Sequence, residues 1–245
     1  MKKPKLATSQ NRVGLHACYE CLLHRPKNVE KAYISRTKQD PLFVKIKKLL
    51  EKHNIPTEIV KKSFLDLMSF NHQGLGLKVN ACLELDWKTL ENAEESKKSM
   101  ILCIDGVEDP HNLGALIRTA WLMGVKAIFV AEHQGLNALT PTVYKVACGG
   151  AEYVPVVFTT KLPFLIEKIK EKSYWVYGLS HRAKEDIYQC NYANNMAFVL
   201  GSESGGIRKS VENTCDVLLK IPQVSANASY NMSVAGALAL SRGCL

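Results

Sequence analysis

The segment GVEDPHNLGALIRTA places Asn112, Gly114 and Arg118 directly after the apolar run MILCID. Asp109 and Pro110 are expected to end the preceding strand, and Asn112 can cap the helix that follows. Arg118 is a long cation in an otherwise apolar helix, which is costly unless its side chain reaches a ligand or a counter-charge. Arg118 is therefore a candidate for binding an anion. An arginine at the helix edge that pairs with a surface carboxylate would give the same pattern.

A glycine-rich segment, VLGSESGGI, continues from the apolar run MAFVLG. Gly201, Gly205 and Gly206 allow a tight turn whose main-chain N–H groups can meet a ligand, and Glu203 can bond a hydroxyl or fix a neighbouring loop. Glycine-rich turns after strands also bind phosphate groups. However, the sequence contains neither a GxGxxG string that opens a strand–helix–strand unit nor a GxxxxGK[ST] phosphate loop. The turn is therefore a candidate ligand site outside the common nucleotide-binding families.

The third segment, IPQVSANASYNMSVAGALALSR, joins an apolar run to the last helix. Pro222 ends the strand, and the loop that follows is rich in Ser, Asn and Ala. An ordinary strand–loop–helix connection with Ser229 as the helix cap would explain part of the pattern. The helix that begins at Asn231 carries small side chains that permit close backbone packing, namely Ser233, Ala235, Gly236, Ala237 and Ala239.

The elements that position these segments form an α/β domain over residues 100–245. Its expected strands are nearly continuous apolar runs, which is typical of parallel strands covered on both faces. The strands are MILCID, KAIFVA, EYVPVV, YWVYGL, MAFVLG and DVLLKIP, and the helices between them are NLGALIRTAWLMG, TPTVYKVACGG and PFLIEKIKEK.

A smaller α/β domain is predicted over residues 14–84, after a basic arm at 1–13 and before a polar linker at 85–99. Helical and strand patterns alternate in it with short connections, which favours a small sandwich with its own sheet. Asp40 and Pro41 are expected to begin an amphipathic helix, and Ser63 to cap a short one.

The charge of the chain is divided unevenly along its length. The 245 residues carry a net charge of +9, yet residues 1–80 hold 16 basic and 6 acidic side chains, whereas residues 81–245 hold 16 and 17. A compact basic region attached to a near-neutral one is typical of proteins that bind a polyanion such as RNA. A merely soluble basic surface would have the same composition.

The cysteines and the chain start indicate a cytoplasmic protein. Eight cysteines are scattered along the sequence, no run approaches the roughly 18 apolar residues that span a membrane, and the first residues, MKKPKLATSQ, are not an apolar signal segment. Cys18 and Cys21 form a lone CxxC pair, but a second pair of zinc ligands is not evident. They fit instead on the apolar face of a helix with Leu15 and Leu22, so no metal is expected.

Together, the three segments resemble the signature motifs of the SpoU/TrmH (SPOUT) family of RNA 2′-O-methyltransferases. All three occur in the family's order. The N-terminal region, through GLHACYECLL, AYIS and NHQGLGLKV, is similar to the accessory RNA-binding domain of the ribosomal-RNA guanosine 2′-O-methyltransferases, which resembles a ribosomal-protein sandwich. The matching residues are Asn112, Gly114 and Arg118, then Leu200, Gly201, Glu203 and Gly206, then Ile221, Pro222, Ser229, Asn231 and Ser233.

This resemblance implies a trefoil-knotted methyltransferase domain that binds S-adenosyl-L-methionine. The cofactor's adenine and ribose would be held mainly by main-chain groups at Gly201, Ile221 and Tyr230. The sequence departs from the family at Ser225, where glycine is usual, and at Tyr230, where leucine is usual. The cofactor-binding residues implied are Leu200, Gly201, Ile221, Gln223 and Tyr230.

The implied reaction transfers a methyl group to a ribose 2′-hydroxyl of RNA, at a guanosine of large-subunit ribosomal RNA. The family gives the role of base to the arginine, here Arg118, although a guanidinium stays protonated above about pH 12. We expect Arg118 to grip the adjacent phosphate through two hydrogen bonds and stabilise the developing alkoxide, while phosphate or water accepts the proton. Asn112, Glu203, Ser229 and Asn231 would orient the ribose and the loops.

The resemblance also implies a homodimer formed through the helices of the knotted domain. Three alternatives stay open at this point. A transfer-RNA ribose 2′-O-methyltransferase would usually lack the accessory domain at 14–84. A catalytically idle RNA-binding or ribosome-assembly protein would not bind the cofactor. A nicotinamide or flavin oxidoreductase would need the dinucleotide fingerprint that is missing here.

Overall fold

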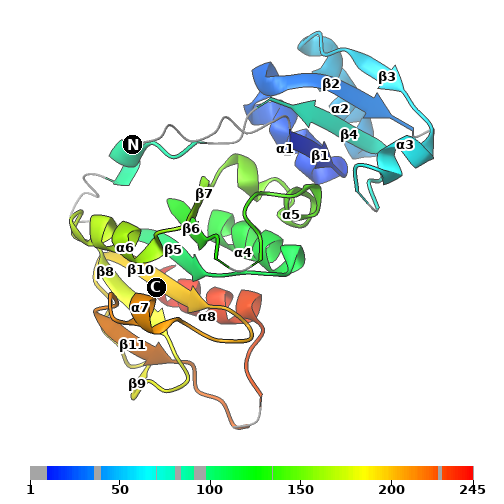
Figure 1. Cartoon of the computed structure of the whole chain (residues 1–245). Coiled ribbons are helices and arrows are strands. Elements are labelled where there is room, and N and C mark those ends of the chain that lie inside the picture. Colours follow the sequence, from blue (N-terminus) through cyan, green and yellow to red (C-terminus); the bar gives the residue numbers. More distant parts are fainter. Residues whose placement is uncertain are drawn as a thin grey trace. The chain divides into compact units, whose positions relative to one another are not determined.

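The computed structural model describes residues 10–35, 40–69, 71–80, 84–90, 98–133, 135–225 and 228–244. The chain divides into two compact units (Figure 1). Unit 1 comprises Met1–Leu83 together with Leu139–Tyr153, and unit 2 comprises Glu84–Ala138 together with Val154–Leu245. Both units combine helices with a sheet, so the predicted α/β class with a small N-terminal sheet is confirmed.

Unit 1 contains a four-stranded mixed sheet in the order β1-β4-β2-β3. Its central strand β4 pairs antiparallel with both β1 and β2, while β3 adds to β2 in parallel. The strands are β1 (Gln10–Val13), β2 (Val29–Ile34), β3 (Thr57–Ile59) and β4 (Leu75–Val79), and the helices are α1 (Leu15–His24), η1 (Pro26–Asn28), α2 (Pro41–Lys52) and α3 (Lys62–Asp66). The basic arm predicted at 1–13 therefore includes a strand of the sheet, and residues 1–9 lie outside the described part of the chain.

The core of unit 1 lies where α1 and α2 pack together against the sheet. Cys18 and Cys21 are fully buried there beside Leu15 and Leu22, and burial raises the pKa of the Cys21 thiol to about 12. The prediction that this CxxC pair packs as part of an apolar helix face is confirmed. Among the described residues, no three or more His, Cys, Asp or Glu side chains are grouped so that they could hold a metal ion.

The helix starts of unit 1 differ in one place from expectation. The amphipathic helix begins at Pro41 as predicted, and Asp40 caps it, because its carboxylate accepts a hydrogen bond of 2.9 Å from the main-chain nitrogen of Leu42. Ser63 was expected to cap α3, which is wrong. That helix already begins at Lys62, so Ser63 lies inside its first turn, and Lys61 precedes it without a side-chain cap.

Unit 1 also includes α5 (Pro141–Val146) and η3 (Gly150–Glu152), which the sequence places in the second domain. The reason is a buried ion pair. Arg12 is fully buried, its Nε donates to Oε1 of Glu152 at 2.5 Å, and its guanidinium lies 3.4 Å from the ring centroid of Tyr144. Arg25 adds a bond of 3.1 Å from Nη1 to Oε2 of the same glutamate. Two cations from the N-terminal region thus bind Glu152 and keep residues 139–153 packed within unit 1.

Unit 2 contains a seven-stranded sheet in the order β7-β6-β5-β10-β8-β11-β9, and all of its strand pairs are parallel. Every residue of β5 and β6 is buried, which confirms the prediction made from their continuous apolar runs. The two-residue strand β9 at the edge was not predicted. The strands are β5 (Ser99–Asp105), β6 (Ala127–Ala131), β7 (Val156–Thr159), β8 (Trp175–Leu179), β9 (Glu185–Asp186), β10 (Asn195–Gly201) and β11 (Val217–Lys220).

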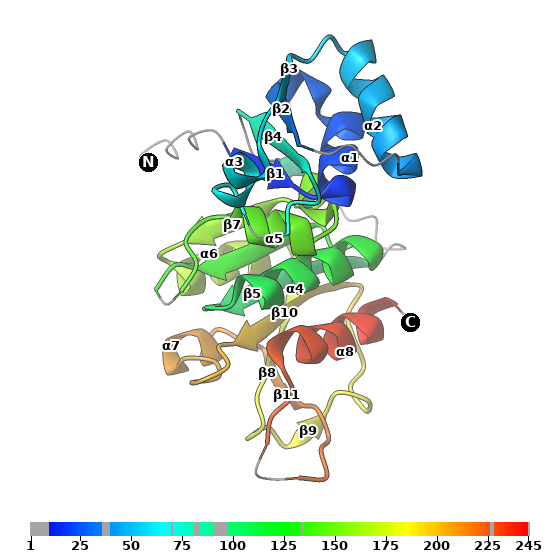
Figure 2. The same cartoon turned by 90° about the vertical axis from the view of Figure 1, so that its right-hand side faces the viewer.

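Helices cover the sheet of unit 2 on both faces. They are η2 (Trp87–Leu90), α4 (Pro110–Leu122), α6 (Leu162–Lys170), α7 (Lys209–Glu212) and α8 (Met232–Cys244). Figure 2 shows α4 and α8 side by side along the sheet, and they contact each other closely. A Cβ atom on Gly236 would lie only 2.3 Å from Cδ2 of Leu116 and 3.0 Å from Cδ1 of Leu200. The small residues of α8 therefore permit close packing within one chain. The described residues include no helix with the length and apolar character needed to cross a bilayer.

We expect Glu152→Gln to lower the unfolding free energy of unit 1 by on the order of 3 kcal/mol, because it leaves the buried Arg12 guanidinium without its counter-charge. Native-state hydrogen exchange of peptides from residues 10–35 measures this directly. Glu58→Gln is the matched control, because it breaks an ion pair with Lys31 at the surface. The side chains of Glu58 and Lys31 are 49% and 39% exposed, so this substitution should cost less than about 1 kcal/mol. Equal effects of the two substitutions would show that the buried pair does not hold unit 1 together.

Candidate active site

A cavity of about 430 Å³ opens at the carboxyl ends of β8, β10 and β11 in unit 2. In parallel α/β sheets this edge is where ligands bind, because the loops that follow the strands converge there. All five residues predicted to bind a cofactor and two predicted to orient the substrate line the cavity. They are Leu200, Gly201, Ile221, Gln223 and Tyr230, and then Glu203 and Ser229.

The glycine-rich loop after β10 closes on itself at the rim of this cavity. Ser202 and Gly206 exchange two main-chain hydrogen bonds of 3.0 Å, and Gly206 has a φ of 66°, a conformation that favours glycine. A Cβ atom on Gly201 would lie 2.0 Å from the carbonyl carbon of Gly206. The tight turn predicted from the glycines is therefore present, and a side chain at position 201 would force it open.

A cluster of amides surrounds the carboxylate of Glu203. Asn112 donates from Nδ2 to Oε1 of Glu203, and Asn231 donates from Nδ2 to Oδ1 of Asn112 at 3.0 Å and to Oε1 of Glu203 at 3.4 Å. Asn112 is 7% exposed. The structure therefore joins one residue from each of the three motifs, although Asn112 and Asn231 do not themselves line the cavity.

This cluster changes the capping assignments made from the sequence. Asn112 does not cap α4: Asp109 does, by accepting 2.8 Å from the main-chain nitrogen of His111. The amide of Asn112 bonds Glu203 from inside the helix. Ser229 does not cap α8 either, because Oδ1 of Asn231 accepts 2.9 Å from the main-chain nitrogen and 2.6 Å from Oγ of Ser233.

Arg118 is exposed on α4, and the described residues that line the cavity do not include it. It lies six positions after Asn112, which is a rise of about 9 Å along the helix. Within one chain, the cofactor-binding candidates therefore line a common cavity to which Arg118 does not contribute. Its catalytic role stays a prediction.

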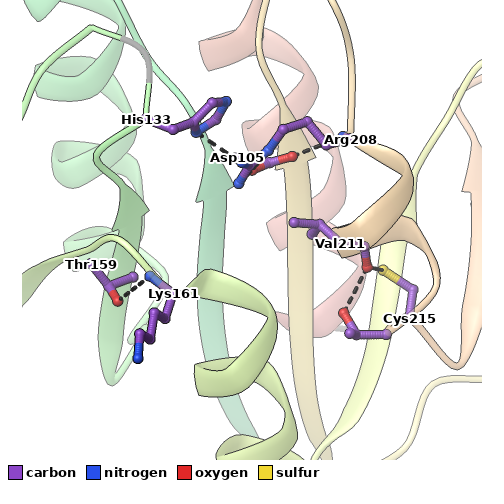
Figure 3. A network of polar contacts seen from close by, with 8 residues as sticks. Asp105, His133, Thr159, Lys161, Arg208, Val211 and Cys215 are labelled. Carbon is purple, nitrogen blue, oxygen red and sulfur yellow. Dashed lines mark hydrogen bonds and ion pairs between the residues drawn. The ribbon is translucent and has the colours of Figure 1, made fainter.

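An ion pair that the sequence analysis missed fixes the base of the glycine-rich loop (Figure 3). Asp105 is fully buried at the end of β5, in register with Gly201 of β10. It accepts hydrogen bonds from Arg208 at three atoms: the main-chain nitrogen at 2.8 Å, Nε at 2.9 Å and Nη2 at 2.6 Å. Nδ1 of His133 lies 4.0 Å from the same carboxylate. An acidic residue that ends a continuous apolar strand was the available signal.

The sequence analysis also missed the loop after β8. Ser180, His181 and Arg182 line the cavity from this loop, and Met232 and Ala235 line it from α8. Polar and basic residues directly after a buried strand could have indicated the first three, because the carboxyl ends of parallel strands meet at one edge.

Comparison with known proteins decides the family. Residues 99–241 match the sequence profile of the SpoU rRNA Methylase family. The chain belongs to this family. Residues 13–82 match a second profile, described as RNA 2′-O ribose methyltransferase substrate binding. The predicted family, with its accessory domain and its class of RNA methyltransferase, is confirmed.

The chain is similar to curated relatives and to a solved structure over almost its whole length. It is 35% identical over 230 residues to the 23S rRNA (guanosine-2′-O-)-methyltransferase RlmB of Vibrio vulnificus, covering 93% of each chain. The RlmB of Neisseria meningitidis is 35% identical over 248 residues, with 96% of this chain and 95% of that one covered. The SpoU methyltransferase AviRb of Streptomyces viridochromogenes in complex with AdoMet has a TM-score of 0.80 at 16% identity, covering 96% and 89%. The last comparison shows the shared fold.

We expect Arg208→Gln to lower the unfolding free energy of unit 2 by on the order of 3 kcal/mol, because it removes the guanidinium counter-charge of the buried Asp105 carboxylate and leaves it only the main-chain donor at position 208. In this variant, hydrogen exchange of peptides that span residues 199–208 should be faster than in the unmodified protein. The neighbouring Lys209→Gln is the control, since the Lys209 side chain is 78% exposed and pairs only loosely with Glu212 at 3.4 Å. If both variants exchange like the unmodified protein, the ion pair does not fix the loop.

Proposed function

We propose that this protein uses S-adenosyl-L-methionine to methylate the ribose 2′-hydroxyl of a guanosine in 23S ribosomal RNA. The observation that carries the proposal is that the five predicted cofactor-binding residues, from the end of β10 and from the connection between β11 and α8, line one cavity. The relatives named for this reaction match the chain at 35% identity over 93% of its length. The substrate-binding match at residues 13–82 lies in the basic part of the sequence.

The cavity fits an adenosyl group. Its walls combine apolar side chains, such as Leu200 and Ile221, with the backbone of the closed turn at Gly201 and Gly206, which lines the cavity. Main-chain donors and acceptors can read an adenine edge without charged side chains. Tyr230 is anchored, since its hydroxyl donates to the main-chain oxygen of Pro222 at 3.1 Å.

The methyl donor supplies an already activated methyl group when bound, so the protein must align the acceptor oxygen and help its proton to leave. Asn112, Glu203 and Asn231 form a preorganised hydrogen-bonding cluster next to the cavity, and Ser229 lies on its wall. These residues orient the ribose and the loops. Arg118 grips the neighbouring phosphate through two hydrogen bonds and stabilises negative charge on the acceptor oxygen.

The remaining predictions belong to the same proposal. The chain after Ile221 threads through a preceding loop to form the knot, and two copies associate through the methyltransferase domain. Val234 of α8 and Leu122 of α4 are 45% and 71% exposed, so these helices offer apolar side chains for that contact. Residues 14–84 bind ribosomal RNA, residues 85–99 link them to the methyltransferase domain at 100–245, and the protein is cytoplasmic. Its seven described cysteines are free thiols, which is common in that compartment.

The purified protein should transfer the methyl group of S-adenosyl-L-methionine to a guanosine 2′-oxygen in a 23S ribosomal RNA transcript. Arg118→Lys should reduce kcat by roughly 100-fold or more, because lysine keeps the charge but loses the planar fork that binds a phosphate at two points. Site-resolved mapping of 2′-O-methyl groups measures both.

Lys126→Arg serves as the control for changing a cation of unit 2, and it should leave turnover unchanged. Near-full turnover by Arg118→Lys would contradict the two-point contact. Methylation of a transfer-RNA transcript in preference to 23S RNA would contradict the substrate, and lack of any cofactor binding would favour an idle RNA-binding protein.

A further inference from the structure

Two basic side chains that the proposed reaction does not use line the cofactor cavity. His181 and Arg182 follow β8, and both are exposed in the part of the chain that the structure describes. The main-chain nitrogen of Arg182 donates to Oγ of Ser180 at 3.3 Å, which fixes the turn at this point. Within the described residues, neither basic side chain has a hydrogen-bond or ion-pair partner.

The lining of the cavity also includes a residue of the contrary charge. Glu203 is the only carboxylate among its described lining residues, and Oε1 of Glu203 already accepts from Asn112 and Asn231. The cavity thus presents a cationic loop after β8 and an anionic residue after β10, strands that pair directly in the sheet. A ligand with charges of both signs fits such a cavity better than a neutral or purely cationic one.

The proposed methyl donor has that charge pattern. Its sulfonium and ammonium groups are cationic, its adenine and ribose are neutral, and its amino-acid carboxylate is its single anion. Moving a carboxylate from water into a protein site has a large desolvation cost unless a hydrogen-bonding partner is present there. A guanidinium relieves that cost with two parallel hydrogen bonds.

We propose that Arg182, with His181 beside it, binds the carboxylate of the amino-acid part of the methyl donor. This inference rests on the proposed function, because it assigns a partner to one group of that cofactor. An RNA phosphate offers the same oxyanion chemistry. The carboxylate is favoured because Arg182 lines the same cavity as Leu200, Ile221 and Tyr230, the residues assigned to the adenosyl group.

Two ligands separate the carboxylate from the rest of the cofactor. S-Adenosylhomocysteine carries the amino-acid part, whereas 5′-methylthioadenosine has the same adenosyl and sulfur groups without it. Isothermal titration should show that Arg182→Gln weakens the binding of S-adenosylhomocysteine by roughly 10- to 100-fold, because a hydrogen-bonded charge pair is lost. The affinity for 5′-methylthioadenosine should fall by less than about twofold.

Lys184→Gln is the matched control, because Lys184 is exposed on the same loop but does not line the cavity, and it should change neither affinity. An equal loss for both ligands would overturn the proposal, since Arg182 would then only shape the cavity. Unchanged affinities combined with a raised KM for RNA would also overturn it, in favour of a phosphate contact. If the unmodified protein bound neither ligand, the proposed function itself would fail, which is a distinct result.

Discussion

The buried carboxylate of Asp105 determines the geometry of the candidate site. A charge without solvent needs a close partner, and Arg208 meets it with its main-chain nitrogen and two side-chain nitrogens. Arg208 follows the glycine-rich turn and Asp105 is in register with Gly201 at its start, so the ion pair connects the end of the turn to the strand that neighbours its beginning. The loop is thereby held before any ligand arrives, which reduces the entropy lost on binding.

A second buried charge pair organises unit 1 on the same principle. Arg12 lies between Glu152 and the ring of Tyr144, so residues 139–153 pack with the N-terminal sheet. These residues fall inside the span that matches the methylase family, 99–241, rather than inside the substrate-binding span, 13–82. The division into structural units therefore does not follow the division into sequence families. A truncation after residue 82 would remove both the glutamate and the tyrosine ring that contact the Arg12 guanidinium.

The regular parts of the fold could be predicted because their signals are local. The apolar runs of β5, β6 and β10 are long enough to identify buried parallel strands. The glycines at 201 and 206 indicate the tight turn that follows β10. The two residues of β9 and the four of α7 are too short to show any periodicity. Several residues in the first turn of a helix, such as Asn112, could serve as caps, so the true cap depends on which side chains find other partners.

The polar constellation itself could be predicted only in part. Asn112, Glu203 and Asn231 were identified through their motifs, and the structure brings them into one cluster. Asp105 and Arg208 are 103 positions apart, and their pairing depends on β5 and β10 becoming neighbours, which no local pattern encodes. Arg182 likewise became a candidate only once the ends of β8 and β10 were seen to share a cavity.

A crystal structure with bound S-adenosylhomocysteine would test most directly whether main-chain atoms of these loops hold the methyl donor. We expect its adenine within hydrogen-bonding distance of main-chain groups in residues 200–206, 221–223 or 230, with the Asp105–Arg208 pair intact. Adenine held by charged side chains at another edge of the sheet, or a glycine-rich loop that opens to admit it, would contradict this account.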